Sequence, residues 1–415
     1  MSTVFPASDL THTVCQVRQA ASKLAQADPE SQSQALEVMA QAMLHYQDDI
    51  LEANTLDLEA SREMAVPDLV LDWLKLTPER LQAVAKILQR LAALGDLSPQ
   101  TLGLPFIKHS APTYWQATPL GVVALIYEAF PELGAIAAGL CIRTGNGLVL
   151  KGSGEASQSN QVISQVLRGA IAEAGLPPDS LLFLPPDQGD VIRNLVVQTR
   201  NINLVIPYGR PSLVQQVVRQ STIPVLPSVM GNCYLYWTLS GNLETVYGMI
   251  GDSRQEEPDP VNSIEKVLVH EGCSDSNLTR LWRLLQEQGY EIRGDDALVA
   301  EFPELGLAHP SEWRQPYLDK TIAFKRVNSL GQAASLINQN SSGHADCLAT
   351  ELYAESRQFA LEVQSASLYI NTSPRFSRNP KQGTAISLGM SSQKGRCGGL
   401  IGLEALTRIQ RIVQG

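Results

Sequence analysis

Short apolar runs alternate with amphipathic stretches along most of this chain after its first hundred residues. The runs are rich in aliphatic and β-branched side chains, as expected of strands that are buried on both faces. The first series of expected strands covers 121–129, 147–151, 181–184, 203–207 and 224–226. Helical patterns separate them near 131–143, 156–174, 188–199 and 211–220. This alternation predicts parallel strand–helix–strand units.

A second series of the same kind follows from Cys233 onward. We expect its strands near 233–239, 264–270, 321–327, 346–352 and 367–371. Helices are expected between them near 276–289, 328–338 and 354–364. Two successive series predict two α/β domains with a cleft between them.

The first hundred residues carry a helical pattern instead. The clearest helix is expected from Thr77, which suits the N-cap, with Pro78 at the first helical position. Its apolar positions recur every three or four residues and predict one buried stripe. They are Leu81, Val84, Ala85, Leu88 and Leu91.

Composition is that of an ordinary globular protein with more than one domain. The 415 residues exceed the usual size of a single core, and 44% of them are hydrophobic. The formal net charge of −10, without any basic run, disfavours nucleic-acid binding. The sequence lacks a run of about 18 apolar residues that could span a bilayer, and its start lacks the pattern of a secretory signal. We expect a cytoplasmic protein that binds neither nucleic acid nor membrane.

The cysteine pattern argues against disulfides and metal sites. The six cysteines are Cys15, Cys141, Cys233, Cys273, Cys347 and Cys397. They are scattered without a CxxC pair, which in a chain of this length favours reduced thiols. Histidine and cysteine do not occur at the spacing of a zinc site, so no metal is expected.

Seven stretches along the chain point together to one family. They are PLGVVALIYEAFPE (119–132), LCIRTGNGLVLKGSGEAS (140–157), QSTIPVL (220–226), SIEKVLVH (263–270), YINTSPRF (369–376), SSQK (391–394) and GLEALT (402–407). Each stretch is weak alone. Their order, over nearly the whole chain, resembles the γ-glutamyl phosphate reductases, also called glutamate-5-semialdehyde dehydrogenases.

The resemblance implies an α/β fold like that of aldehyde dehydrogenases. It would have two Rossmann-like parallel-sheet domains, a helical N-terminal segment and a small oligomerising β extension. The β extension implies a homo-oligomer, either a dimer or a tetramer. The expected boundaries are 1–103 and 119–240 for a nucleotide-binding-type domain, 104–118 and 408–415 for the oligomerising β segment, 241–375 for a catalytic-type domain, and 376–407 for a return to the nucleotide-binding-type domain.

The family chemistry sets three requirements for this chain. Members reduce γ-glutamyl phosphate with NADPH to glutamate semialdehyde and phosphate, in proline biosynthesis. A cysteine thiolate displaces phosphate to form a thioester, and hydride transfer then gives the aldehyde. The resemblance therefore implies a thiolate, an oxyanion-binding group and a nucleotide-binding loop.

The nucleophile is missing from its expected position. In the family the cysteine stands one residue before an asparagine, ahead of the SIEKVLVH-like strand. Asn262 and Glu265 keep their places here, and Val261 occupies the position of the cysteine. Its side chain has no lone pair and cannot attack as a thiolate does. Cys397, in the stretch KGRCGG, is the candidate for a displaced nucleophile, whereas Cys233 is interpreted as a core residue.

The oxyanion-binding group is also changed. The family supplies an asparagine just after its YEARP motif, where a hydrogen-bond donor stabilises developing negative charge. This chain reads YEAFPEL, so Glu132 stands at the asparagine position and Phe130 replaces the arginine. A carboxylate repels an oxyanion. We interpret Phe130 as a packing residue and Glu132 as a solvated carboxylate at a helix start.

Two loops are expected to contact the cofactor. One matches the family turn against the adenosine ribose and carries Lys151, Gly152, Ser153 and Glu155. The other replaces the family pattern Gly-Gly-Ala-Gly with Gly209, Arg210, Pro211 and Ser212. Glycine lets backbone approach phosphates closely, so this change disfavours NADPH binding, although Arg210 can pair with a phosphate.

Four further residues are placed in the substrate cleft by the resemblance, namely Tyr127, Glu128, Asn371 and Arg375. Because the departures gather at the site while the scaffold stretches persist, we favour a catalytically silent relative with a regulatory or structural role, such as assembly with a protein partner. The alternatives are a working reductase with a displaced nucleophile and a protein that uses the same cleft for another ligand.

Overall fold

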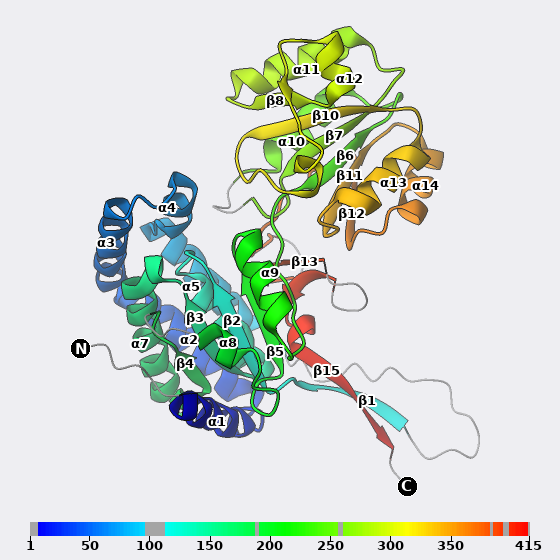
Figure 1. Ribbon diagram of the computed structural model, residues 1–415. Coiled ribbons are helices and arrows are strands. Elements are labelled where there is room, and N and C mark those ends of the chain that lie inside the picture. Colours follow the sequence, from blue (N-terminus) through cyan, green and yellow to red (C-terminus); the bar gives the residue numbers. More distant parts are fainter. Residues whose placement is uncertain are drawn as a thin grey trace. The chain divides into compact units, whose positions relative to one another are not determined.

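The computed structural model describes residues 7–95, 113–186, 191–255, 260–381, 385–392 and 398–413. The chain divides into two compact units (Figure 1). Unit 1 comprises Met1–Pro227, Arg378–Leu388 and Leu400–Gly415, and unit 2 comprises Ser228–Ser377 and Gly389–Gly399. Among the described helices, none is long and apolar enough to cross a membrane.

Unit 1 begins with helices, which confirms the expectation for the first hundred residues. They are α1 (Ala7–Leu24), α2 (Pro29–His45), α3 (Gln47–Glu63), α4 (Asp68–Leu74) and α5 (Pro78–Ala93). The Thr77 hydroxyl accepts a hydrogen bond from the Arg80 amide at 3.3 Å and caps α5 as predicted. The predicted apolar stripe of α5 is buried.

A parallel sheet follows in unit 1, with the strand order β4-β3-β2-β5. Its strands are β2 (Val122–Tyr127), β3 (Gly147–Gly152), β4 (Leu181–Phe183) and β5 (Leu204–Tyr208). Its helices are α6 (Leu133–Thr144), α7 (Ser157–Glu173), α8 (Val191–Leu195) and α9 (Pro211–Gln220). Alternate residues of β2 face opposite sides: Val122 and Ala124 pack with α1, whereas Val123 and Leu125 lie with α6.

The expected strand at 224–226 does not extend into a ladder. Val225 forms only an isolated parallel bridge with Val205. The Val205 amide donates to the Pro224 carbonyl at 2.9 Å, and the Leu226 amide donates to the Val205 carbonyl at 2.8 Å. Proline has no amide hydrogen to continue the pairing, so the segment ends as a bridge.

Unit 2 contains a second parallel sheet, with the strand order β12-β11-β6-β7-β10-β8-β9. Its strands are β6 (Cys233–Trp237), β7 (Ile264–His270), β8 (Glu291–Gly294), β9 (Gly306–Leu307), β10 (Thr321–Val327), β11 (Ala345–Ala349) and β12 (Ser367–Ile370). Every neighbouring pair in it is parallel, so the amino ends of the strands share one edge and the carboxyl ends share the other.

Helices cover both faces of this sheet. The core on one face includes α10 (Leu243–Asp252), α11 (Asp275–Glu287) and α12 (Asp296–Glu301). The core on the other face includes α13 (Leu330–Asn340) and α14 (Tyr353–Glu362). The predicted arrangement of buried parallel strands with helical connections is confirmed.

The remaining elements are short or irregular. Strand β1 (Thr113–Pro119) pairs antiparallel with β15 (Thr407–Val413), and β13 (Ser387–Ser391) pairs with β14 (Gly399–Gly402). Short 3₁₀ helices lie at Gly154–Ala156, Pro178–Ser180, Glu312–Arg314 and Glu404–Leu406. Strands β1 and β15 overlap the two halves of the expected oligomerising β segment. Residues 104–112 and 414–415 of that segment lie outside the described residues.

The boundary between the units differs from the expected one at residue 240. Unit 1 ends at Pro227, because β6 pairs with β7 and β11 in the sheet of unit 2. The expected return at 376–407 also differs, since Gly389–Gly399 belongs to unit 2. The first difference arises from strand pairing, which the sequence pattern alone does not specify.

Candidate active site

In unit 1, the expected cofactor residues lie at or just after the carboxyl ends of β3 and β5, and the expected cleft residues Tyr127 and Glu128 lie at the end of β2, the strand between them. Tyr127, the last residue of β2, lies opposite Gly152 of β3 and Tyr208 of β5. The loops that follow these strands are therefore adjacent. In an open α/β sheet, ligands bind at this edge, where the order of strands reverses. Here the reversal lies between β2 and β5.

Glu128 and Arg210 occupy that position. One carboxylate oxygen of Glu128 accepts from the Arg210 amide at 2.8 Å and from its Nε at 3.1 Å, and the other accepts from Nη2 at 3.1 Å. A side-chain carbon on Gly209 would lie 2.8 Å from Glu128 Oε2, so the carboxylate fills the space beside this glycine. The hydrogen bond from Arg210 to Glu128 raises the pKa of the guanidinium, and the charge of Glu155 adds to this. Glu128 thus supplies the anion at the start of α9.

The turn after β3 is held by hydrogen bonds within unit 1. The Lys151 ammonium donates to the Gly152 carbonyl at 2.9 Å. A side-chain carbon on Gly152 would lie 2.2 Å from Asn160 Nδ2, so only glycine fits there. The Ser153 hydroxyl accepts from the Ala129 amide at 3.1 Å. The structure brings these predicted residues together, but uses them to hold the turn.

Tyr127 does not line a cleft, contrary to the expectation from the sequence. Its side chain is buried, and its hydroxyl donates to Asn160 Oδ1 at 2.9 Å. Burial raises the pKa of this phenol. The alternation along β2 explains the error, because it turns Tyr127 toward the face covered by α6, where Gly134 lies beneath the hydroxyl.

Glu132 is buried and paired, so its interpretation as a solvated carboxylate is wrong. It forms an ion pair with Arg80 of α5, whose guanidinium also donates to the Trp73 carbonyl at 3.1 Å. Phe130 stacks on Trp73 with ring centroids 4.8 Å apart and meets Tyr208 edge-on at 5.6 Å. The interpretation of Phe130 as a packing residue is confirmed.

In unit 2, the segment that precedes β7 is buried and held by backbone contacts. The Val261 carbonyl accepts from the Gly231 amide at 3.0 Å and lies 2.7 Å from His344 Nε2. The Asn262 side chain donates to the Pro374 carbonyl at 2.7 Å. The Val261 side chain is buried as well. This position therefore presents hydrocarbon inside a fixed frame.

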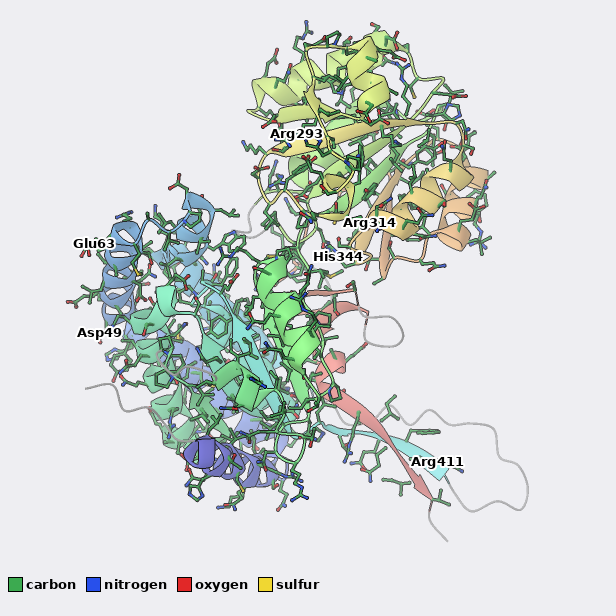
Figure 2. The ribbon with its side chains drawn as sticks, in the orientation of Figure 1. Asp49, Glu63, Arg293, Arg314, His344 and Arg411 are labelled. Carbon is green, nitrogen blue, oxygen red and sulfur yellow. The ribbon has the colours of Figure 1, made fainter. Side chains whose placement is uncertain are left out.

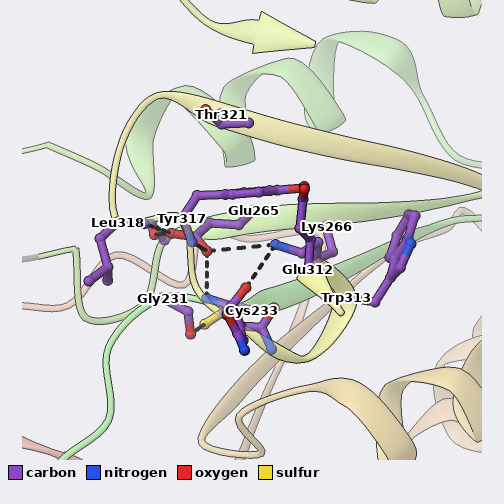
Figure 3. Close-up of polar contacts among 12 residues, drawn as sticks. Gly231, Cys233, Glu265, Lys266, Glu312, Trp313, Tyr317, Leu318 and Thr321 are labelled. Carbon is purple, nitrogen blue, oxygen red and sulfur yellow. Dashed lines mark hydrogen bonds and ion pairs between the residues drawn. The ribbon is translucent and has the colours of Figure 1, made fainter. Parts of the chain in front are cut away.

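Glu265 ties together the loops around this frame (Figure 3). Its buried carboxylate accepts from the amides of Asn232 at 2.9 Å, Tyr317 at 2.8 Å and Leu318 at 3.0 Å. Arg254 donates to it at 3.1 Å and supplies the compensating charge. A buried carboxylate with this many donors is satisfied, and its role in unit 2 is structural.

Asn371 is not brought together with Val261, whereas Arg375 follows Pro374, whose carbonyl accepts from Asn262. Asn371 follows the carboxyl end of β12, where its side chain accepts from the Thr350 amide at 2.8 Å and donates to the Thr350 carbonyl at 2.6 Å. Val261 precedes the amino end of β7, at the opposite edge of this parallel sheet. Arg375 pairs with Asp252, at the end of α10, at 3.0 Å. The expectation of one cleft containing Asn371 and the nucleophile position is therefore wrong.

The chain is similar to proteins of one enzyme family. The sequence pattern of the aldehyde dehydrogenase family matches residues 4–232. Gamma-glutamyl phosphate reductase 2 of Synechocystis sp. is 51% identical over 92% of this chain and 91% of its own. Gamma-glutamyl phosphate reductase of Gloeobacter violaceus is 37% identical over 94% and 93%. The crystal structure of the Thermotoga maritima reductase matches with a TM-score of 0.89 and 28% identity, over 98% of both chains.

The chain belongs to the γ-glutamyl phosphate reductase family. The family resemblance and the aldehyde-dehydrogenase fold expected from the sequence are thereby confirmed.

The family resemblance implies a thiolate, and Cys233 contacts the same histidine nitrogen as the Val261 carbonyl. Its sulfur lies 3.4 Å from His344 Nε2. The same nitrogen faces the Val261 carbonyl, which can only accept, so Nε2 carries the proton and cannot take one from the thiol. Burial raises the pKa of Cys233 well above its usual range. Cys233 is therefore a core residue, as the sequence indicated.

The other described thiols of unit 2 are protonated too. Burial raises the pKa of Cys347 and of Cys273. Cys397, the candidate for a displaced nucleophile, lies outside the described residues. Within the described ranges, no three histidine, cysteine, aspartate or glutamate side chains gather as a metal site requires.

Aldehyde dehydrogenases use nicotinamide cofactors, and the loops of unit 1 do not fit the phosphates of such a group in this arrangement. The Glu128 carboxylate takes the amide and guanidinium donors of Arg210 that a phosphate would use. The negative charge of the carboxylate would also repel a phosphate that approached Arg210. Binding there requires Glu128 to leave Arg210.

Proposed function

We propose that this protein is a catalytically silent member of the γ-glutamyl phosphate reductase family with a regulatory or structural role. One observation carries the proposal. Val261, which the family resemblance aligns with the nucleophilic cysteine, is a buried hydrocarbon held in a fixed frame.

The chemical reason is the loss of the covalent step. Displacement of phosphate needs a polarisable nucleophile, and the valine side chain has none. In a concerted site, loss of the nucleophile alone costs on the order of 10⁶ in kcat. The described thiols of unit 2 do not offer a replacement, because burial raises the pKa values of Cys233, Cys347 and Cys273.

The other groups at the aligned positions support the same proposal. Glu132 is engaged with Arg80, and Glu128 is engaged with Arg210. Among the described residues, Glu132 therefore offers no donor to an oxyanion, and the donors of Arg210 are already engaged by a carboxylate. We infer that NADPH binding is weak or lost.

The role that we propose is assembly with another chain through the β1–β15 ribbon. Ile409 and Val413 are exposed on β15, and Figure 2 shows Arg411 projecting from the same strand. A two-stranded sheet leaves an open edge on each strand, and such edges pair readily with another chain. We propose a homo-oligomer, a dimer or a tetramer, or a mixed assembly with an active reductase as protein partner.

The test is a turnover assay of the purified protein. Oxidation of glutamate semialdehyde with NADP and phosphate is followed by absorbance, with the Thermotoga maritima reductase as positive control. We expect a rate equal to the blank. A clear rate that is lost in Cys397→Ala would overturn the proposal in favour of a displaced nucleophile. A parallel NADPH titration by fluorescence identifies any use of the nucleotide without turnover.

A further inference from the structure

Unit 2 contains a cavity of about 360 Å³ on the face of its sheet that carries α13. Tyr234 of β6 and Leu268 of β7 line it from the sheet, and Leu336 lines it from α13. Small-molecule sites range from about 300 to 1,000 Å³, so this cavity suits a small ligand.

The charged part of the cavity lies away from the nucleophile position. Asp295 and Asp296, which line it, follow the carboxyl end of β8. Val261 precedes the amino end of β7, at the other edge of the sheet. A ligand in the cavity would therefore not depend on the family reaction or on its loss.

The apolar walls of the cavity are fixed in position. The Tyr234 hydroxyl donates to the Trp313 carbonyl at 2.6 Å, which fastens the segment carrying Trp313 over the sheet. Tyr234 and Leu268 are fully buried, whereas the Trp313 ring is half-buried. Preformed apolar and aromatic walls of this kind bind the hydrocarbon part of a ligand without first having to become ordered.

The charges on the cavity lining are asymmetric. Lys325 of β10 pairs with Asp295 at 2.7 Å, and Asp295 also accepts from the Leu298 amide at 3.2 Å. An ammonium has three hydrogens, and this pair uses one of them. Asp296 is exposed and forms no ion pair with any described residue. The lining thus offers one carboxylate and part of one ammonium to a ligand.

We propose that this cavity binds a free α-amino acid with an apolar side chain. The ligand carboxylate would accept from the Lys325 ammonium, and its own ammonium would donate to Asp296. Its side chain would pack against Trp313 and Leu336. A zwitterion satisfies both charges at once, whereas an apolar anion would leave Asp296 unpaired and an apolar amine would not use Lys325.

The experiment is isothermal titration calorimetry on the full chain with L-leucine, L-proline and L-phenylalanine. We expect saturable binding of at least one of them. Asp296→Asn and Lys325→Met should each weaken it roughly tenfold or more, because each removes a charge-assisted hydrogen bond. Glu271→Gln, which removes an exposed carboxylate that does not line the cavity, should leave affinity unchanged. N-Acetyl-L-leucine and L-leucinamide, which lack one charge each, should bind more weakly than L-leucine.

The proposal fails if none of the three amino acids binds at millimolar concentration. It also fails if Asp296→Asn binds as tightly as the unchanged protein, or if N-acetyl-L-leucine matches L-leucine. Because Asp296 is exposed and unpaired, its variant tests recognition even if Lys325→Met is too unstable to measure.

Discussion

The Glu128 carboxylate accepts hydrogen bonds from both the backbone amide and the guanidinium of Arg210. The two residues follow neighbouring parallel strands, β2 and β5, at the edge where an α/β sheet binds its ligands. The Glu128 carboxylate thus lies at the start of α9, where the family resemblance leads us to expect a phosphate of the cofactor.

Glu128→Gln should increase the affinity for NADPH by about tenfold, because it removes a negative charge from the phosphate position, partly screened by solvent. A fluorescence titration with NADPH measures the change. The matched control is Glu173→Gln, which removes an exposed carboxylate on α7. Equal affinities of Glu128→Gln and the unchanged protein would show that the Glu128–Arg210 pair does not limit binding.

Val261→Cys alone should not restore reductase activity. The new thiol would be buried, and His344 Nε2 already donates to the backbone carbonyl of residue 261, so His344 cannot act as its base. Glu132 also remains where the family has an oxyanion donor. The assay is phosphate-dependent reduction of NADP by glutamate semialdehyde, with Val261→Ala as control. A robust rate in the cysteine variant would show that the rest of the site is intact.

Arg80→Met should destabilise unit 1 by about 3–5 kcal/mol, because it leaves the Glu132 carboxylate buried without its counter-charge. Urea unfolding measures the loss. The double variant Arg80→Met/Glu132→Leu should recover most of it, since no buried charge then remains. If the single variant is as stable as the unchanged protein, Glu132 is not held by this ion pair and its role must be sought elsewhere.

Two buried groups of unit 2, His344 and Asp346, should have opposite effects on the free energy of unfolding as the pH falls. Burial lowers the pKa of His344 to about 4, so the unfolded chain binds a proton below about 6.5 and stability falls with acidification. Burial raises the pKa of Asp346 to about 7, so its folded state holds a proton that the unfolded chain releases above about 3.9. That contribution grows as the pH falls from 7 to 4, and the two largely cancel.

Asp346→Asn should therefore expose the His344 effect. Between pH 6.5 and 4.5 we expect this variant to lose up to about 1.4 kcal/mol of unfolding free energy per pH unit relative to the unchanged protein. Urea unfolding at several pH values gives the slope, and His344→Gln should change it in the opposite direction. Identical slopes for Asp346→Asn and the unchanged protein would contradict the assignment.

Local pattern predicted the elements best where strands are buried on both faces. The bounds of β7, β10 and α9 agree with the expected 264–270, 321–327 and 211–220. Both strands carry several aliphatic or aromatic side chains between helical stretches, although each also contains charged residues. Strand β8 was missed, because its four residues, Glu291–Gly294, are few and contain a single apolar side chain, Ile292.

By itself, the sequence determined that Val261 is a hydrocarbon and that the chain alternates strands and helices, since both are properties of residues and their neighbours. Only the tertiary structure decided that Glu132 pairs with Arg80 and Glu128 with Arg210. It also decided that β6 joins the second sheet and that Asn371 and Val261 lie at opposite edges of it. These relationships join residues far apart in the chain. Strand pairing and the burial of side chains against one another determine these relationships. Hydrophobic periodicity describes only neighbouring residues and does not specify either of them.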